Sequence, residues 1–386
     1  MELRQKYRLG EVFNVLDSKR IPLSSKERES RRGNYPYYGA QGIIDYIDDY
    51  IFDGEYLLIA EDGENLKSQK QNIAQIARGK YWVNNHAHIL ESNGKCDIRY
   101  ICHLLNKMDI SGYITGSAQP KLNQANLCSI EVELPDIQEQ KRIAEFIGNF
   151  DDKIELNRQI NDNLEQQAQT LYKSWFVDFE PFKDGAFKES EFGLIPEGWR
   201  VGSLSDLTEI TMGQSPSGKS YNETGDGMLF YQGRAEFGDR YPSIRLYTTE
   251  PSRIAEQNSV LLSVRAPVGD TNIAYNKCCI GRGLASITAK HGFNSFIFYM
   301  IKSLKDQFDL YNGEGTVFGS INRDSLNSMK VIVPTNEVIN DFEKIVAPLD
   351  FKYKSIFSEN LLLTQQRDTL LPKLMSGELK INEIDC

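Results

Sequence analysis

The sequence predicts an α+β protein in which two mixed α/β domains stand in tandem, joined by two long antiparallel coiled-coil helices with approximate two-fold symmetry. Three observations carry this prediction. The chain repeats itself at an offset of 199 residues, each copy ends in a heptad pattern, and short strand-like runs followed by glycine turns fill the remainder. With 386 residues, the chain is long enough for two or three domains.

The repeat is clearest between 116–123 and 315–322, which read Gly-Ser-Ala-Gln-Pro-Lys-Leu-Asn and Gly-Thr-Val-Phe-Gly-Ser-Ile-Asn. The register then continues without a gap, and its matched pairs are Leu127 with Leu326, Val132 with Val331, Pro135 with Pro334 and Asp151 with Asp350. The beginnings of the copies match at a shorter offset, where Tyr7-Arg-Leu-Gly resembles Trp199-Arg-Val-Gly. Because the period is far too long for a solenoid, we expect two copies of one large unit.

After each shared proline the sequence becomes rich in charge and poor in glycine, which predicts helices over 137–178 and 336–376. At 1.5 Å per residue each would be about 45 to 60 Å long. The predicted seam between them consists of Ile147, Phe150, Ile154, Asn161, Leu164 and Leu171 with Val346, Leu349, Tyr353, Asn360, Leu363 and Leu370. A buried amide at Asn161 or Asn360 can fix register and partner, but both residues can equally be solvated stutters in a loose seam.

The helices divide the chain into a first domain over 1–136, a second domain over 179–335 and a tail over 377–386. If the seams pack together, the second helix must run back along the first, which returns the C-terminus close to the first domain. Within the domains, Tyr56-Leu-Leu-Ile-Ala and Val260-Leu-Leu-Ser-Val predict strands. The spacing of apolar residues at 98–105 and 297–304 predicts a short helix in each copy.

The formal net charge of −10 seems to argue against nucleic-acid binding, but its distribution matters more than its sum. The two predicted helices, with short flanks, carry −4 over 137–180 and −3 over 336–386, whereas the two domains carry −2 and −1. The nearly neutral domains can therefore hold local basic faces. No apolar run is long enough to span a membrane, and the six cysteines form no C-x-x-C pair, so we expect a cytoplasmic chain with reduced thiols.

Motifs for catalysis or metal binding are weak. Asn34-Tyr-Pro-Tyr resembles the base-holding loop of amino-methyltransferases, but no glycine-rich turn for S-adenosylmethionine precedes it. Asp136 and Glu139 mimic nuclease carboxylates, yet their spacing fits an N-cap and capping box better. His86 and His88 point to one face of a predicted strand without a third ligand nearby, which favours an ordinary pair over a zinc site. We therefore expect no catalytic residues, no metal and no cofactor bound by this chain.

Basic, amide and aromatic residues gather in loops of the first domain, where they suit contacts to phosphates and base edges. The candidates are Lys26, Arg28, Arg31, Arg32, Asn34, Tyr35, Tyr37 and Gln41, then Lys67 and Lys70, and finally Lys121. Glu27 and Glu29 dilute the first group, so a plain solvated loop is an open alternative.

The second domain offers a similar set, which consists of Gln214, Ser215, Lys219, Gln232, Arg234, Arg240, Arg245, Arg265 and Arg282. Glycines on both sides of Arg282 would let the backbone approach a groove. Gly-Arg-Gly is also common in hairpins, so structural roles for Arg265 and Arg282 stay open. The recurrence of the same loop chemistry in two domains favours nucleic-acid contact.

Taken together, these features resemble the specificity subunit of a type I restriction-modification system over essentially the whole chain. The resemblance is carried by the motifs at 37–42, 52–63, 174–182, 194–199, 265–269 and 371–379. In the last four the chain reads Ser-Trp-Phe-Val-Asp-Phe-Glu-Pro-Phe, Leu-Ile-Pro-Glu-Gly-Trp, Arg-Ala-Pro-Val-Gly and Leu-Pro-Lys-Leu-Met-Ser-Gly-Glu-Leu. Each motif is modest alone, but their order and spacing are specific.

The resemblance implies two target-recognition domains that each read half of a bipartite site in double-stranded DNA, and a helical pair that sets the spacer. It implies two modification subunits that bind S-adenosylmethionine, and restriction subunits, with translocase and nuclease activity, that use ATP and Mg. It does not identify the base contacts. The competing interpretations are a self-contained methyltransferase and a scaffold that binds only proteins.

Overall fold

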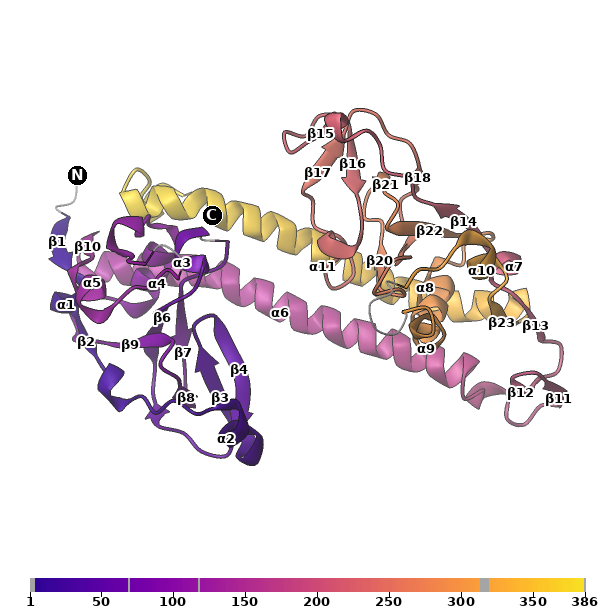
Figure 1. Cartoon of the computed structure of the whole chain (residues 1–386), viewed down its shortest axis with the longest axis horizontal. Coiled ribbons are helices and arrows are strands. Elements are labelled where there is room, and N and C mark those ends of the chain that lie inside the picture. The colour runs from indigo at the N-terminus through magenta and orange to yellow at the C-terminus, as the bar shows by residue number, and fades with distance from the viewer. Residues whose placement is uncertain (1–3, 69, 117–118, 313–318, 385–386) are drawn as a thin grey trace. The chain divides into compact units, whose positions relative to one another are not determined.

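Two long helices run through the fold, α6 (Ile137–Phe176) and α11 (Asn336–Ser376). Figure 1 draws α6 in magenta and α11 in yellow. This computed structural model describes residues 4–68, 70–116, 119–312 and 319–384. The chain divides into two compact units, one of 1–157 with 359–386 and one of 158–358. Each unit therefore holds one mixed domain and one end of both helices.

The first domain contains two four-stranded sheets. One has the antiparallel order β2 (Phe13–Val15), β9 (Ala87–Ser92), β6 (Tyr56–Ala60) and β7 (Ala74–Ala77). The other has the order β4 (Gly42–Ile47), β3 (Arg32–Gly39), β8 (Lys80–Val83) and β5 (Phe52–Asp53). In this second sheet β3 and β8 are parallel. Beside the sheets lie the ladder of β1 (Gln5–Arg8) with β10 (Glu131–Leu134) and the helices α1 (Leu9–Val12), α2 (Ser25–Ser30), α3 (Asn65–Ser68), α4 (Ile98–Lys107) and α5 (Gln124–Ser129).

The second domain repeats this topology. Its first sheet has the order β14 (Thr208–Met212), β22 (Leu284–Ala289), β19 (Val260–Ser263) and β20 (Thr271–Ile273). Its other sheet has the order β15 (Tyr221–Asn222), β17 (Leu246–Thr248), β16 (Met228–Tyr231), β21 (Cys278–Ile280) and β18 (Ile254–Ala255), again with one parallel pair, β16 with β21. The remaining elements are the ladder of β13 (Arg200–Ser203) with β23 (Lys330–Val333), the hairpin of β11 (Phe187–Ser190) with β12 (Gly193–Pro196), and α7 (Leu204–Leu207), α8 (Asn294–Ser303), α9 (Lys305–Asp309) and α10 (Arg323–Asn327).

The predicted duplication is confirmed, but its register at the start of each copy is corrected. Tyr7 pairs with Val132, and Gly202 pairs with the equivalent Val331, so Tyr7 corresponds to Gly202. The match of Tyr7-Arg-Leu-Gly to Trp199-Arg-Val-Gly is therefore wrong by three residues. The shared Arg-x-Gly pattern gave the wrong alignment because Arg8 and Gly10 are exposed and their identities are little constrained. Trp199, which that alignment matched to Tyr7 of the β1 ladder, instead belongs to the core of the second unit.

The short helices of the two copies differ in their surroundings. The prediction of one short helix per copy is confirmed by α4 and α8. Helix α4 is amphipathic, but residues 295–301 of α8 are all buried. The caps that follow are alike, because the side chains of Asn123 and Asn322 accept bonds from the backbone N–H groups of Asn126 and Ser325 at 2.9 and 2.8 Å. Residues 117–118 and 313–318 of the repeated segment lie outside the described residues.

In the first unit, the start of α6 packs antiparallel against the end of α11. Asn157 donates to the side-chain oxygen of Asn360 at 2.8 Å, and one turn and a half earlier Asp151 accepts from Arg367 at 2.6 Å. Asn157 is buried, so this amide pair crosses a seam closed to water. The predicted seam residues, Asn161 of the second unit included, are buried or half-buried. At the end of α11, Arg4 donates to the carbonyls of Leu374 and Met375.

In the second unit, aromatic side chains join the two helices to the domain. Phe342 of α11 contacts Tyr172, Trp175 and Phe176 of α6, and Phe176 also packs on Trp199. The motif at 174–182 thus supplies core rather than a linker. Within the part of the chain that the structure describes, no helix is long and apolar enough to cross a membrane.

Arg240 fastens the second domain to both helices. Its guanidinium is 2.6 Å from Asp350 of α11 and 3.0 Å from Glu165 of α6, and only 2% of the side chain is exposed. Asp350 is the counterpart of Asp151 in the sequence repeat. In the first unit Arg367 of α11 binds Asp151, but the equivalent position of α6 is Ala168, so α6 offers no arginine to Asp350 there. The prediction of Arg240 as a DNA contact is wrong, because burial and two carboxylates already occupy its guanidinium.

Replacing Arg240 tests this fastening. In Arg240→Met, two half-buried carboxylates lose their counterion, so we expect the second unit to lose about 3–5 kcal/mol of unfolding free energy. The matched control is Lys277→Met, because Lys277 forms an exposed ion pair with Glu256 and should change stability by less than about 1 kcal/mol. Urea denaturation followed by tryptophan fluorescence measures both. Equal stability of the two variants would contradict the assigned role.

Candidate nucleic-acid interface

Three connections meet at one end of the sheets in the first domain. They are 61–63 after β6, 84–86 between β8 and β9, and 120–122 before α5. The Glu61 N–H donates to the His86 carbonyl at 2.9 Å, the Leu122 N–H to Glu61 at 2.8 Å, and the Gly63 N–H to Pro120 at 3.2 Å. We call these connections the first loop junction. Backbone bonds hold it together, so its frame does not depend on which side chains it carries.

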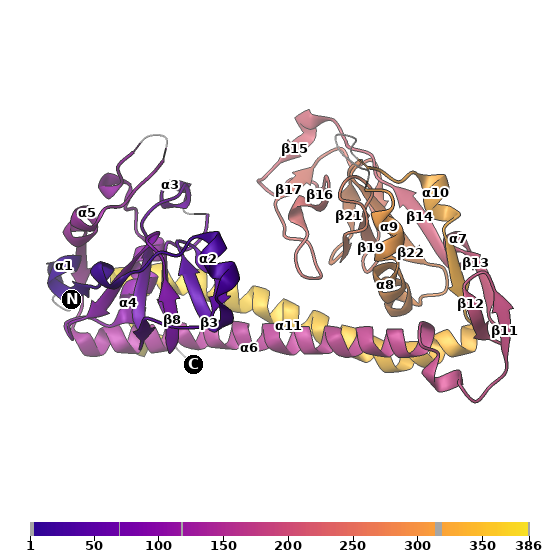
Figure 2. The ribbon, with the colours of Figure 1, turned by 60° about the horizontal axis from the view of Figure 1, so that its bottom comes forward.

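The second domain builds the same frame from 264–266, 281–283 and 319–321, the second loop junction. The Val264 N–H donates to the Gly283 carbonyl at 2.9 Å, the Ile321 N–H to Val264 at 3.1 Å, and the Ala266 N–H to Gly319 at 3.0 Å. Each bond has its counterpart in the first junction. Figure 2 labels strands that end at these junctions, β8 at the first junction and β19 and β21 at the second. Equivalent positions are Asp62 with Arg265, Asn85 with Arg282, His86 with Gly283 and Lys121 with Ser320.

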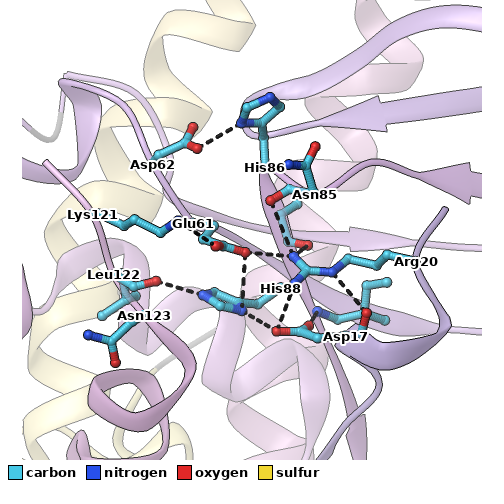
Figure 3. A network of polar contacts seen from close by, with 12 residues as sticks. Asp17, Arg20, Glu61, Asp62, Asn85, His86, His88, Lys121, Leu122 and Asn123 are labelled. Carbon is cyan, nitrogen blue, oxygen red and sulfur yellow. Dashed lines mark hydrogen bonds and ion pairs between the residues drawn. The ribbon is translucent and has the colours of Figure 1, made fainter. Parts of the chain in front are cut away.

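A network of charged side chains lies within the first junction (Figure 3). His88 is 1% exposed, and its Nδ1 lies 2.5 Å from the Asp17 carboxylate while its Nε2 lies 2.7 Å from the Leu122 carbonyl. Arg20 binds Glu61 at 2.7 Å and Asp17 at 3.3 Å. Lys121 reaches Glu61 at 3.1 Å from the solvent side.

The carboxylates of this network are held ionised. Burial opposes ionisation of Asp17 most strongly, but the hydrogen bond and charge of His88, with Arg20, outweigh it and lower the pKa of Asp17. Burial likewise opposes ionisation of Glu61, and bonds from Arg20 and Lys121 outweigh it and lower the pKa of Glu61. Two cations thus occupy the carboxylates beneath the junction.

Asp17, Glu61 and His88 also place metal-ligand atoms within 4.8 Å of one another. Arg20 and Lys121 neutralise the same carboxylates, so the arrangement is that of a closed ion-pair network. The expectation that His86 and His88 form an ordinary pair on one strand face needs correction. His86 is half-exposed and bonds Asp62 at 2.7 Å, whereas His88 points inward. Sequence spacing gave no signal for the cluster, because Asp17 and His88 are 71 residues apart.

The predicted contacts at and near α2 and β3 include paired, buried and exposed side chains. Arg28 binds Asp45 at 3.0 Å and Arg31 binds Asp48 at 2.9 Å, so their charges are largely neutralised. Tyr37 is fully buried, and its hydroxyl accepts a bond from the Leu23 N–H at 2.9 Å, so its prediction as a DNA contact is wrong. Lys26, Arg32, Asn34 and Gln41 are exposed, and Tyr35 is half-buried against Tyr50.

The remaining candidates of the first domain lie nearer its loop junction. Lys67 and Lys70 are exposed at and after α3, where the Lys67 ammonium donates to the Gly116 carbonyl at 3.1 Å. Lys121 belongs to the junction itself. The turn of Asn84, Asn85 and His86, in which Asn84 is buried and the other two residues are exposed, was missed, although a polar triplet between two apolar strand runs is a signal for such a turn.

The second domain gathers more of its candidates at one place. Arg265 and Arg282 belong to the junction and are exposed, and the loop of Gln214 and Ser215 joins it through a bond from the Arg282 N–H to Ser215 Oγ at 3.3 Å. The exposed Gln232 packs against Gly281. Outside this group, Arg234 pairs with Asp270, Arg245 pairs with the buried Glu236, and Lys219 is exposed at a 3-10 turn.

The role expected for the glycines beside Arg282 is corrected. A Cβ at Gly281 would lie 2.8 Å from Gln232 Cα, and one at Gly283 would lie 2.8 Å from the Gln232 carbonyl oxygen. The space that these glycines leave is therefore filled by the neighbouring loop. They permit close packing within the junction, and it is the Arg282 side chain that stays outside.

The ionised network predicts a loss of stability in acid. Because the folded pKa values of Asp17 and Glu61 lie below their usual 3.8 and 4.5, their stabilisation is complete above pH 4.5 and is lost as pH falls through the folded values. Asp17→Asn should lower the unfolding free energy of the first unit by about 1–3 kcal/mol at pH 7, with the gap from wild type closing in acid. Urea denaturation at pH 7 and at pH 4 and below measures this. A gap that widens in acid would contradict the assignment.

The comparisons with known proteins agree with this architecture. The family described as "Type I restriction modification DNA specificity domain" matches residues 1–166 and 196–350. The putative type I restriction enzyme MjaX specificity subunit of Methanocaldococcus jannaschii is 32% identical over 98% of this chain and 95% of its own. The type I restriction enzyme HindI specificity subunit of Haemophilus influenzae is 27% identical over 67% of this chain and 71% of its own.

A solved structure shares the fold. The crystal structure of the type I restriction-modification system S subunit from M. genitalium covers 97% of this chain and 96% of its own, with a TM-score of 0.65 and 15% sequence identity. The two family matches fall on the two domains and their adjoining helix ends. The chain belongs to the family of type I restriction-modification DNA specificity subunits.

Proposed function

We propose that this specificity subunit reads a bipartite DNA site, one half with each domain, while α6 and α11 set the spacer and dock the modification subunits. The observation that carries the proposal is the pair of loop junctions, which repeat one backbone frame and fill it with different side chains. Two readers of two different half-sites need this combination, because an unchanged frame positions a surface while its side chains select the bases.

The same proposal leaves catalysis to partner subunits. Asp136 accepts bonds from the Gln138 and Glu139 N–H groups at 2.9 Å, which caps α6, and Glu139 pairs with Arg142. Asn34 belongs to β3, which pairs with β4, rather than to an open base-holding loop. Both catalytic likenesses are thus explained structurally. S-adenosylmethionine would be bound by the modification subunits, and ATP and Mg by the restriction subunits.

Exposed apolar side chains on the helices support docking. Phe351 is 76% exposed, and Leu156, Ile160, Ile345, Leu361 and Leu362 are also exposed. These residues lie on otherwise charged helices, where an apolar side chain in water contributes nothing to folding. Because the helices carry most of the negative charge of the chain, they suit protein partners better than phosphates.

Sequencing of methylated adenines in cells that express this chain with its modification subunit tests the bipartite site. We expect two conserved blocks separated by an unspecified spacer. Four residues inserted in the middle of α6 add about 6 Å, more than one base-pair step of about 3.4 Å, so the spacer should lengthen with both half-sites unchanged. The same insertion in the β11–β12 turn is the control. An uninterrupted site, or a spacer unmoved by the α6 insertion, would refute the proposal.

Charges placed at these exposed apolar side chains test docking. Phe351→Glu and Leu362→Glu should each reduce co-purification of the modification subunit at least tenfold, because a charge would have to be buried at the interface. Lys352→Glu, which changes charge at a neighbouring exposed position, is the control. Thermal melting of the variants should match wild type, since these side chains are exposed. Undiminished co-purification of both apolar variants would exclude Phe351 and Leu362 from the docking site of the modification subunit.

A further inference from the structure

We infer that Asn85 and Arg282, which occupy equivalent turns of the two loop junctions, are specificity-determining residues, and that the charged network beneath Asn85 is its positioning device. This inference rests on the proposed function and names the residues that carry it out. Arg282 would select guanine, because its fork can bind O6 and N7 together. Asn85 would select adenine, because its amide can pair with N6 and N7.

The turn of Arg282 combines a rigid backbone with an unoccupied side chain. Gly281 and Gly283 pack on the Gln232 backbone, the Gly281 N–H donates to Tyr231 at 2.8 Å, and the Gly283 carbonyl accepts from Val264. Among the described residues, the exposed guanidinium of Arg282 has no hydrogen-bond or ion-pair partner. A guanidinium held in place but left unpaired can meet a base edge without first breaking a bond in the protein.

The surroundings of Arg282 fit a base-reading surface. Gln214 and Gln232 are exposed on two loops that pack against the Arg282 turn. Arg265 is exposed on segment 264–266 of the same junction. Amide and guanidinium groups are the side chains that recognise adenine and guanine edges. On the alternative basic surface, at α2 and β3 of the first domain, Arg28 and Arg31 already form ion pairs with Asp45 and Asp48. The loop junctions are therefore favoured.

The equivalent turn of the first domain is held by side chains instead of glycines. The His86 N–H donates to the Asn84 side-chain oxygen at 2.8 Å, and Arg20 donates to the Ala87 carbonyl at 2.9 Å. Arg20 also donates to the Asn85 carbonyl at 3.4 Å (Figure 3). The amide of Asn85 is exposed and has no partner among the described residues. Arg20 therefore supports the turn from below while leaving Asn85 available.

The second domain shows that the fold itself does not require this network. Equivalent strand registers place Met212, Val264 and Ala285 where the first domain has Asp17, Glu61 and His88. Val264 and Ala285 are buried, so the same sites are stable when apolar. Burial of ions costs solvation energy that apolar groups do not pay. What the charges add is a fixed position for the Asn85 turn and for Lys121.

The experiment measures sequence preference with the full chain in complex with its modification subunits, on a library of randomised duplexes. Arg282→Gln should lower discrimination for guanine at one position of the second half-site by roughly 5- to 150-fold and leave the first half-site unchanged. Arg200→Gln, at an exposed arginine on β13, is the matched control and should change neither half-site. A uniform loss of affinity with the same preferred sequence would make Arg282 a phosphate contact and overturn its assignment.

Three variants test the first domain. Asn85→Arg should shift one position of the first half-site from adenine toward guanine. Arg20→Met should weaken the base preference at that position and leave the base preferences of the second half-site unchanged. Arg20→Lys should restore part of the preference, which a purely structural role would not predict. An unchanged first half-site in Asn85→Arg would overturn the inference. If the wild-type complex selects no bipartite sequence, the proposed function itself fails, so the two failures are distinguishable.

Discussion

Neither of the two large hydrophobic cores of this protein is complete without both long helices. In the first unit, Ile143 and Ile147 of α6 and Leu371 and Leu374 of α11 belong to the same buried cluster as the sheet residues. In the second unit, Tyr172 and Phe176 of α6 do so together with Phe342 of α11. Each helix therefore carries two separate packing patterns along its length, one for each domain. Unfolding of either helix would expose apolar surface in both units, so each helix is a structural element of both.

The two copies solve one electrostatic problem in different ways. Asp151 and Asp350 occupy equivalent helix positions, and each meets a guanidinium. In the first unit the guanidinium belongs to Arg367 of the partner helix, whereas in the second Arg240 comes from the domain and also stacks on the rings of Phe298 and Tyr353. Duplication thus preserved the requirement for a counterion but not its source. The loop junctions behave similarly, because their backbone bonds are matched while their side chains are not.

Local patterns explain what the sequence could predict. The heptad spacing predicted helices close to α6 and α11, and short apolar runs followed by glycine turns predicted β6 and β19, since these features are set by neighbours in the chain. Burial of polar residues is set by tertiary packing instead. Arg240 and Tyr37 are of residue types that often contact DNA, but both are buried. The network around His88 joins segments that lie far apart in the sequence, so the spacing of its residues gave no sign of it. Even the register of the copies needed the β-ladders, because a four-residue likeness with two identical residues carries little information.

The distribution of charge also indicates how affinity and specificity are divided. Phosphate contacts dominate the affinity of DNA-binding proteins, and each requires a cation that is not already paired. Many arginines of the domains are committed to internal carboxylates, including Arg20, Arg28, Arg31 and Arg240. Those at the second loop junction, Arg265 and Arg282, stay exposed where base edges would be read. Under the proposed function, a chain of net charge −10 that is arranged in this way selects the sequence, and modification subunits docked on its helices would supply much of the binding energy on DNA.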